Sequence, residues 1–188
     1  MIQVKHLYLT HKKDLRPLLS DFSFALNPGD KAVIIGEEGN GKSTLLKWLA
    51  DPALVEGYTE AEGERITGGA KIGYLPQELP EEEKERTLYA FFCEEEQFFQ
   101  WSPKELSKLA QEMGLPSDFY YGEQQMYTLS GGEKVKAQMA RLLLGEPDVF
   151  LLDEPSNDID IPTLLWMERF IRESEQPMLY ISHDETLI

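Results

Sequence analysis

The nine residues from Gly36 to Thr44 constrain the fold of this chain more than any other stretch. They read Gly-Glu-Glu-Gly-Asn-Gly-Lys-Ser-Thr and match the phosphate-loop pattern G-x-x-x-x-G-K-[ST]. An apolar, β-branched run at 32–35 precedes them, as in a buried parallel strand, and the pattern at 44–50 predicts a helix. A strand, a glycine turn and a helix N-terminus form an anion-binding site, because backbone N–H groups and the helix dipole face the loop.

This loop predicts that the chain binds a nucleotide, with ATP and Mg²⁺ as the expected cofactors. Lys42 is placed to reach the β- and γ-phosphates, and the Ser43 hydroxyl is placed to ligate Mg²⁺. The alternative is a chance glycine turn beside a lysine, which the flanking strand and helix disfavour. The candidate nucleotide-binding residues of the loop are Gly36, Glu37, Glu38, Gly39, Asn40, Gly41, Lys42, Ser43 and Thr44.

The remainder of the chain alternates between strand and helix patterns, which predicts a mostly parallel sheet covered by helices on both faces. Two strands before the loop, at 2–10 and 22–26, are expected to form a small antiparallel sheet. Residues 51–69 are expected to be loop and edge structure, and the acidic stretch 78–85 a solvated surface. Later strands are expected at 71–75, 149–152 and 178–181, and helices at 87–111 (two pieces, broken near Ser102-Pro103), 133–144 and 161–173.

An apolar strand at 149–152 ends in Asp153 and Glu154. The Asp153 carboxylate can hold Mg²⁺, usually through water. Glu154 is expected to point the other way and to polarise the water that attacks the γ-phosphate. The alternative is a pair of surface acids, which the preceding buried run disfavours.

Two further polar residues follow predicted strands. Gln77 can contact Mg²⁺ or the attacking water through its amide, and His183 can donate a hydrogen bond to the γ-phosphate. The alternative to a catalytic role is that Gln77 is simply solvated and that His183 is structural. His6 and His11 are expected to be structural.

A second anion-binding turn, Ser130-Gly131-Gly132, precedes the predicted helix at 133–144. One triphosphate does not need two such turns from one polypeptide. The second turn therefore suggests a nucleotide held between two cassettes.

In order and spacing these motifs resemble those of ATP-binding-cassette (ABC) ATPases, with Leu129-Ser130-Gly131-Gly132-Glu133 as the most specific match. The resemblance spans nearly the whole chain. It implies an α/β P-loop NTPase fold, a mostly parallel sheet flanked by helices, with an N-terminal antiparallel β subdomain and a small helical subdomain at about 79–128. It also implies one nucleotide-binding domain over 1–188 and head-to-tail pairing, in which the turn at Ser130 contacts ATP bound by the opposite cassette.

The run from Asp153 to Asp160 resembles the corresponding segment of ABC-F proteins, as does Ser182-His183-Asp184. ABC-F proteins are tandem cassettes that act on ribosomes, and some protect ribosomes from antibiotics. The chain departs from them in having Asp158 where they have histidine. It also has no obvious aromatic for adenine near 13–16, and no room for a large arm between Gln77 and Ser130.

The first expectation is thus an ABC-F cassette that couples MgATP hydrolysis to work on the ribosome. The alternative is the ATPase subunit of an ABC transporter, docked on membrane-spanning helices through the helical subdomain. A third possibility, a non-catalytic clamp, is disfavoured by Glu154. Because the chain stops soon after His183, it is expected to be truncated, with a second cassette in the full-length chain or in a homodimer.

Composition limits the partners. The net charge of −16 argues against a nonspecific nucleic-acid binder, which needs clustered basic residues. No apolar run of about 18 residues is present, and Cys93 is the only cysteine, so a cytoplasmic location is expected. An aromatic face over 88–99 is expected to be core, with a docking surface as the alternative.

Overall fold

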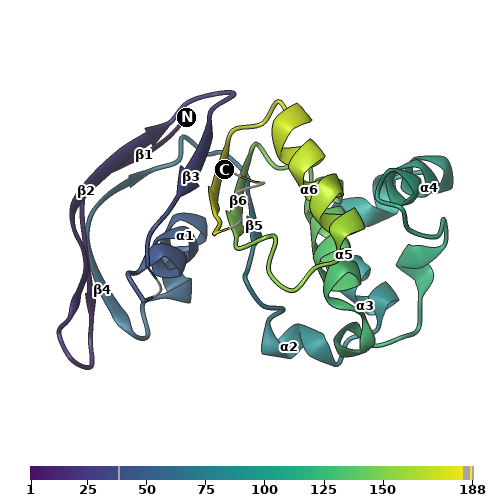
Figure 1. Cartoon of the computed structure of the whole chain (residues 1–188), viewed down its shortest axis with the longest axis horizontal. Helices are drawn as coiled ribbons and strands as arrows, with labels where there is room; N and C mark the ends of the chain where they lie inside the picture. Colours follow the sequence, from purple (N-terminus) through teal and green to yellow (C-terminus); the bar gives the residue numbers. More distant parts are fainter. Residues whose placement is uncertain (38, 184–186, 188) are drawn as a thin grey trace.

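A computed structural model describes residues 1–37, 39–183 and 187, and these residues form two sheets with helices around them (Figure 1). The first sheet is antiparallel, in the order β2-β1-β4. The predicted pairing of the first two strands is confirmed. The expectation for 51–69 is wrong in part, because a third strand forms there and pairs with β1. These strands are β1 (Ile2–His11), β2 (Pro17–Leu26) and β4 (Thr59–Ile66).

The second sheet is parallel, in the order β3-β7-β6-β5, as the alternation of strands and helices predicts. Helix α1 lies between it and the antiparallel sheet, and α5 and α6 lie on the opposite side (Figure 1). The elements are β3 (Lys31–Ile34), β5 (Ile72–Leu75), β6 (Val149–Asp153), β7 (Met178–Ile181), α1 (Lys42–Ala50), α5 (Gly131–Leu144) and α6 (Ile161–Glu173).

Strand β6 is buried at every position because helices cover both faces of this sheet. Its side chains alternate between two hydrophobic clusters. Val149 and Leu151 pack with α1 and the antiparallel sheet, whereas Phe150 and Leu152 pack with α5, α6 and the helical segments. The continuous apolar run in the sequence therefore reflects a strand that separates two cores.

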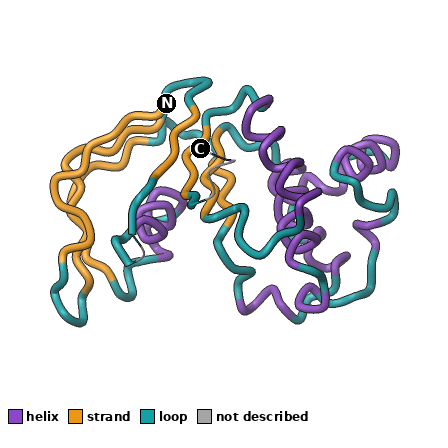
Figure 2. The backbone as a smooth tube through the Cα atoms, in the orientation of Figure 1, coloured by secondary structure: helices purple, strands orange, loops and turns teal. Residues whose placement is uncertain are grey.

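The segment between β5 and α5 is helical and lies at one end of the molecule (Figure 2). The helix predicted at 87–111 forms three pieces, because the chain also breaks between Glu94 and Glu95. Ser102 and Glu105 form a capping box at the predicted second break. The pieces here are α2 (Glu81–Lys84), α3 (Leu88–Cys93), η2 (Glu96–Gln100), α4 (Pro103–Glu112), η3 (Phe119–Tyr121) and η4 (Met126–Thr128), with η1 (Pro52–Leu54) following α1.

The aromatic face of this segment is mostly core, as predicted. Phe91 and Phe92 are fully buried and Phe98 nearly so, and their rings contact one another or Tyr120. Phe99 differs, since its side chain is 65% exposed.

The acidic stretch at 78–85 is not wholly solvated, which corrects the prediction. The side chain of Glu83 is only 13% exposed and lies 3.1 Å from Arg141 of α5 and 3.3 Å from Arg86. The Arg141 guanidinium also lies 3.6 Å from the centre of the Phe91 ring. Glu83 therefore joins α2 to α5 across the helical segment.

Arg65, on β4, fixes the C-terminal end of α1. Its guanidinium donates to the Leu49 carbonyl at 2.9 and 2.6 Å and to the Ala50 carbonyl at 2.9 Å. Helix C-termini leave such carbonyls without intrahelical partners. The antiparallel sheet is thereby tied to the helix that begins at the phosphate loop.

Parallel pairing brings four segments to one edge of the second sheet. Ile181 pairs with both Ile34 and Asp153, and Leu75 pairs with Leu152. The chain leaves these strands at their carboxyl ends, where open α/β sheets bind ligands. Gln77, Asp153, His183 and the phosphate loop are therefore brought to the same edge.

Candidate active site

The phosphate loop turns sharply into α1. Gly39 and Gly41 both have a φ of +78°, a conformation that favours glycine. A Cβ at Gly41 would also lie 2.9 Å from the Cβ of Leu18. The loop positions at 36, 37, 40 and 44 are described, and Glu38 lies outside the described residues. Lys42 and Ser43 thus fall in the first turn of the helix, at its positive end.

The Lys42 ammonium donates to backbone carbonyls of its own loop. One bond reaches the Gly36 oxygen at 2.7 Å and another the Glu37 oxygen. Ser43 Oγ donates to Asp153 Oδ1 at 3.0 Å. Phosphate oxygens can replace the carbonyls as acceptors for Lys42, and a cation can bind between the Ser43 hydroxyl oxygen and the Asp153 carboxylate.

Asp153 is 1% exposed, at the end of β6. Besides Ser43, it accepts a hydrogen bond on Oδ2 from the Tyr74 hydroxyl at 3.5 Å. Burial raises the pKa of Asp153 above its ordinary value, and the hydrogen bond from Ser43 opposes this rise. A buried carboxylate beside a serine hydroxyl fits a divalent cation, since charge neutralisation offsets the cost of its burial.

The donor set suits Mg²⁺ in particular. The Ser43 hydroxyl, the Asp153 carboxylate and the Gln77 amide are oxygen donors, and Gln77 lines the same cavity as Ser43. Within the described residues no group of three or more His, Cys, Asp or Glu can hold a metal. A cation here would therefore take most of its ligands from phosphates and water, as Mg²⁺ does.

Glu154 lies beside His183. His183 Nε2 is 2.9 Å from Glu154 Oε1, and the Glu154 side chain is 13% exposed. Glu154 adopts a φ of +51°, unusual for a residue other than glycine, while its N–H donates to the Ile181 carbonyl at 3.1 Å. Strand β7 thus holds the backbone of Glu154 in a conformation that directs its carboxylate to His183.

These residues line one open cavity of about 540 Å³. The predicted residues in its wall are Gly39, Gly41, Lys42, Ser43, Thr44, Gln77, Glu154 and His183. Sequence reasoning missed Asn157, which lies three residues after Glu154, and a further group in the wall made of His11, Arg16, Leu18 and Tyr58.

His11, expected to be structural, thus lines the cavity, and so does an aromatic residue outside 13–16, Tyr58. The His11 and Tyr58 rings lie 6.4 Å apart, centre to centre, at the end of β1 and just before β4. The pairing of His11 with Thr59 brings these segments together. Tyr58 lies in the stretch expected to be loop, so only the β1–β4 pairing reveals it.

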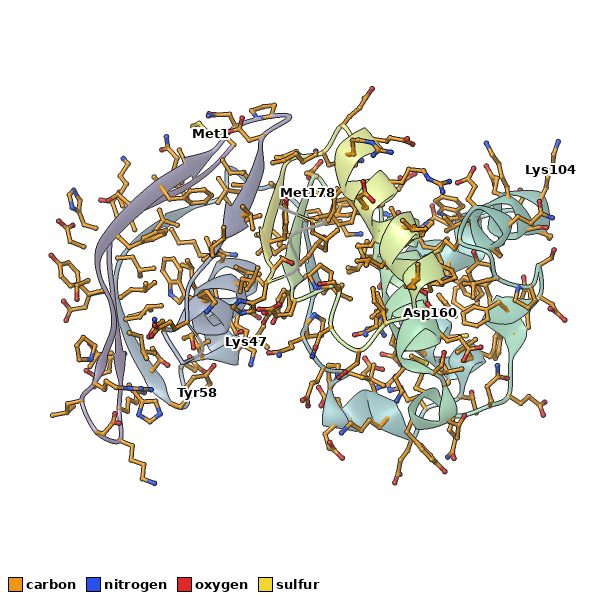
Figure 3. All side chains as sticks on the ribbon, in the orientation of Figure 1. Met1, Lys47, Tyr58, Lys104, Asp160 and Met178 are labelled. Carbon is orange, nitrogen blue, oxygen red and sulfur yellow. The ribbon has the colours of Figure 1, made fainter. Side chains whose placement is uncertain are left out.

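The turn at Ser130 does not line this cavity. Ser130 caps α5 by accepting from the Glu133 N–H, and the Glu133 carboxylate accepts from the Ser130 N–H at 2.9 Å. The chain after Glu154 packs against this turn, since a Cβ at Gly131 would lie 2.0 Å from the Asp158 carbonyl oxygen. Figure 3 shows Asp160, directly before α6, well apart from Tyr58, which lines the cavity. The structure thus separates the two predicted anion sites.

In the part of the chain that the structure describes, no helix is long and apolar enough to span a membrane.

Comparison with known proteins identifies the family. A family model described as "ABC transporter" matches residues 19–157. The "Energy-dependent translational throttle protein EttA" of Haemophilus influenzae is 32% identical, over 90% of this chain and 36% of that protein. The "ATP-binding protein Uup" of Escherichia coli is 33% identical, over 92% of this chain and 27% of that protein. The chain thus spans well under half the length of these curated relatives.

Solved structures share the fold. One titled "Structure of ATP binding subunit of ABC transporter" matches with a TM-score of 0.76 at 20% identity, over 97% of this chain and 79% of the other. Another, "Dimeric Structure of MJ0796, a Bacterial ABC Transporter Cassette", matches with a TM-score of 0.74 at 20% identity, over 100% and 90%. The chain belongs to the ABC transporter family, as an ATP-binding cassette with the ATPase fold, and its sequence is similar to those of the ABC-F proteins EttA and Uup.

Proposed function

We propose that this cassette binds MgATP and hydrolyses it as one half of an ABC-F type pair that acts on the ribosome. The observation that carries the catalytic part is the cavity that Lys42, Gln77, Glu154 and His183 line together. A cation, an amide, a carboxylate and an imidazole there match the needs of phosphoryl transfer, which relies on positioning and charge stabilisation.

The phosphate loop holds the triphosphate. Lys42 exchanges the carbonyls of Gly36 and Glu37 for β- and γ-phosphate oxygens, and the backbone N–H groups at the start of α1 donate to them. Ser43, Asp153 and Gln77 would hold Mg²⁺, which would supply positive charge opposite the phosphates. In the same cavity, the rings of His11 and Tyr58 provide apolar surface for the base.

Glu154 acts on the attacking water. Its carboxylate accepts a hydrogen bond from the water and so directs an oxygen lone pair to the γ-phosphorus. His183 contacts this carboxylate through Nε2 and lines the same cavity, where its imidazole would donate to a γ-phosphate oxygen once ATP is bound. The positive φ of Glu154 is consistent with this role, because backbone strain clusters at active sites.

A second cassette completes the site. Ser130, Gly131 and Gly132 form a helix N-terminus suited to an anion, yet they lie outside the cavity of their own chain. In a head-to-tail pair, within one longer chain or in a homodimer, they contact the nucleotide of the opposite cassette. The "Dimeric" title of the MJ0796 cassette structure supports this arrangement.

The ribosome is the proposed partner, with work as a translation factor or in antibiotic protection of the ribosome, in the cytoplasm. EttA is named a translational throttle protein, and the Asp153–Asp160 run resembles ABC-F proteins. An ATP-closed pair that prefers the ribosome stays bound there while hydrolysis is blocked, through linkage.

Replacing Glu154 by Gln tests both the proposed hydrolysis and the proposed ribosome partner, because it removes the carboxylate and keeps the side-chain shape. We expect ATP hydrolysis to fall by at least about 100-fold, the range of general-base losses, while binding of an ATP analogue is retained. Unchanged hydrolysis would refute the role of Glu154.

Fractionation of cells that express the Glu154→Gln protein tests the partner. We expect ATP-dependent recovery with ribosomes, and Lys42→Ala, which weakens ATP binding, serves as the control that stays in the supernatant. ATP-dependent recovery with membranes and none with ribosomes would favour the alternative, an ABC transporter subunit.

A further inference from the structure

Tyr74 occupies a position that the proposed mechanism leaves unused. It lies on β5, directly paired with Leu151 of β6. Asp153 is two residues further along β6 and therefore faces the same side of the sheet as Leu151. Diagonal neighbours of this kind lie within reach of a long aromatic side chain. The Tyr74 hydroxyl bridges this gap and donates to Asp153 Oδ2 at 3.5 Å.

Both oxygens of the Asp153 carboxylate are consequently engaged by different elements. Oδ1 accepts from Ser43 of α1 and Oδ2 accepts from Tyr74 of β5. Asp153 is 1% exposed, so solvent has almost no access to it. A carboxylate anchored at both oxygens has a fixed plane, whereas one anchored at a single oxygen can still rotate about its Cβ–Cγ bond.

The ring of Tyr74 explains why its hydroxyl stays in place. It packs partly buried against the cluster that contains α1 and Val149, on the side of the sheet that faces α1. The next residue, Leu75, faces the opposite cluster, as strand alternation requires. The hydroxyl therefore has a rigid support on the second sheet, independent of the phosphate loop.

We propose that Tyr74 is a positioning residue that fixes the Asp153 carboxylate, so that Oδ1 faces the Mg²⁺ bound beside Ser43. The proposal rests on the proposed function, and it adds a residue from β5 to the support of the metal. Partners of this kind orient metal ligands, and their removal typically costs about 10–100-fold in metal affinity. Since the hydrogen bond is long, the lower end of this range applies.

The test replaces Tyr74 by Phe, which removes one oxygen and keeps the packed ring. Mn²⁺, followed by electron paramagnetic resonance, is the probe, titrated into the protein saturated with a non-hydrolysable ATP analogue. We expect Mn²⁺ affinity to fall about tenfold relative to the parent. Affinity for the same analogue in EDTA, and the thermal midpoint, should match those of the parent. Tyr127→Phe, at a tyrosine that is 53% exposed, is the matched control and should change none of these.

The outcomes separate the two proposals. Equal Mn²⁺ affinity in Tyr74→Phe and the parent would overturn the positioning role. So would a loss of metal-free analogue binding of the same size as the loss of Mn²⁺ affinity, because that pattern reports general damage to the site. Binding of the analogue by the parent tests the proposed function itself. Steady-state ATPase gives a further check: we expect the half-saturating Mg²⁺ concentration to rise about tenfold, with kcat at saturating Mg²⁺ close to that of the parent.

Discussion

Replacing Arg141 by Met should destabilise this protein more than the loss of an exposed ion pair would. The guanidinium donates to Glu83 at 3.1 Å and to the Phe91 carbonyl at 3.3 Å, and it covers the Phe91 ring. A hydrogen bond to a charged group contributes about 1.5–3 kcal/mol, and a cation–π contact about 0.5–2 kcal/mol. Arg86 remains as a partner for Glu83, so we expect a loss of about 2–4 kcal/mol.

Urea denaturation measures this loss, and for a chain of this size the thermal midpoint should fall by roughly 5–12 °C. Arg172→Met is the control: it breaks an ion pair to Glu168 of similar length, 3.2 Å, but its side chain is 63% exposed. Such surface pairs contribute at most about 1 kcal/mol. Equal effects of Arg141→Met and Arg172→Met would refute the reasoning.

The double variant Glu83→Leu/Arg141→Met sharpens the test. It removes the Glu83 carboxylate, whose side chain is 13% exposed and which the single variant Arg141→Met leaves without one of its two arginine partners. We expect it to lose less stability than the sum of the two single variants, with a coupling energy of about 1–2 kcal/mol. Simple additivity would mean that the two side chains do not interact in solution.

Three further outcomes are expected. Lys42→Ala should weaken binding of a non-hydrolysable ATP analogue about 10–100-fold in titration calorimetry, the equivalent of one charged hydrogen bond; equal affinity would contradict the loop assignment. Gly131→Ala should reduce ATP hydrolysis while analogue binding is kept, and lower stability by about 1–3 kcal/mol, because the new Cβ must displace the Asp158 carbonyl, 2.0 Å away. Contacts with Thr163 lower the pKa of Asp160. The ionised Asp160 carboxylate therefore stabilises the fold at pH values above its pKa in the unfolded chain, and this stabilisation is lost as the pH falls through its lowered pKa in the folded protein. The stability difference between the parent and Asp160→Ala should therefore shrink on acidification in urea titrations, and a constant difference would exclude the ionised cap.

The parts of the fold that sequence reasoning predicted are those encoded locally. The phosphate loop, the strand that ends at Asp153 and the helix after Ser130 each combine a short pattern with its own flanking element. The convergence of the phosphate loop, Gln77, Asp153 and His183 at one sheet edge then follows from parallel pairing. Such features need no knowledge of distant contacts.

The features it missed depend on residues far apart in the chain. The local sequence predicts a solvated Glu83, because its partner, Arg141, is 58 positions away. Tyr58 was placed in a loop because Glu and Gly in 59–66 disfavour a strand, and only pairing with β1 stabilises one there. In the same way, the bond between Tyr74 and Asp153 spans 79 positions, so no local pattern reveals it.

Arg65 connects the antiparallel sheet to the helix that begins at the nucleotide-binding loop. Its guanidinium holds the carbonyls at the negative end of α1, while the phosphate loop presents the positive end of the same helix to the triphosphate. Arg65 and a bound anion each stabilise the same helical conformation of α1, so any effect of the anion on the order of β4 has an equal effect of β4 on anion affinity. Binding of a nucleotide to the loop should therefore slow amide hydrogen exchange in β4 around Arg65. The effect would be a gain of local order at the far end of α1, without a change in the conformation of the helix.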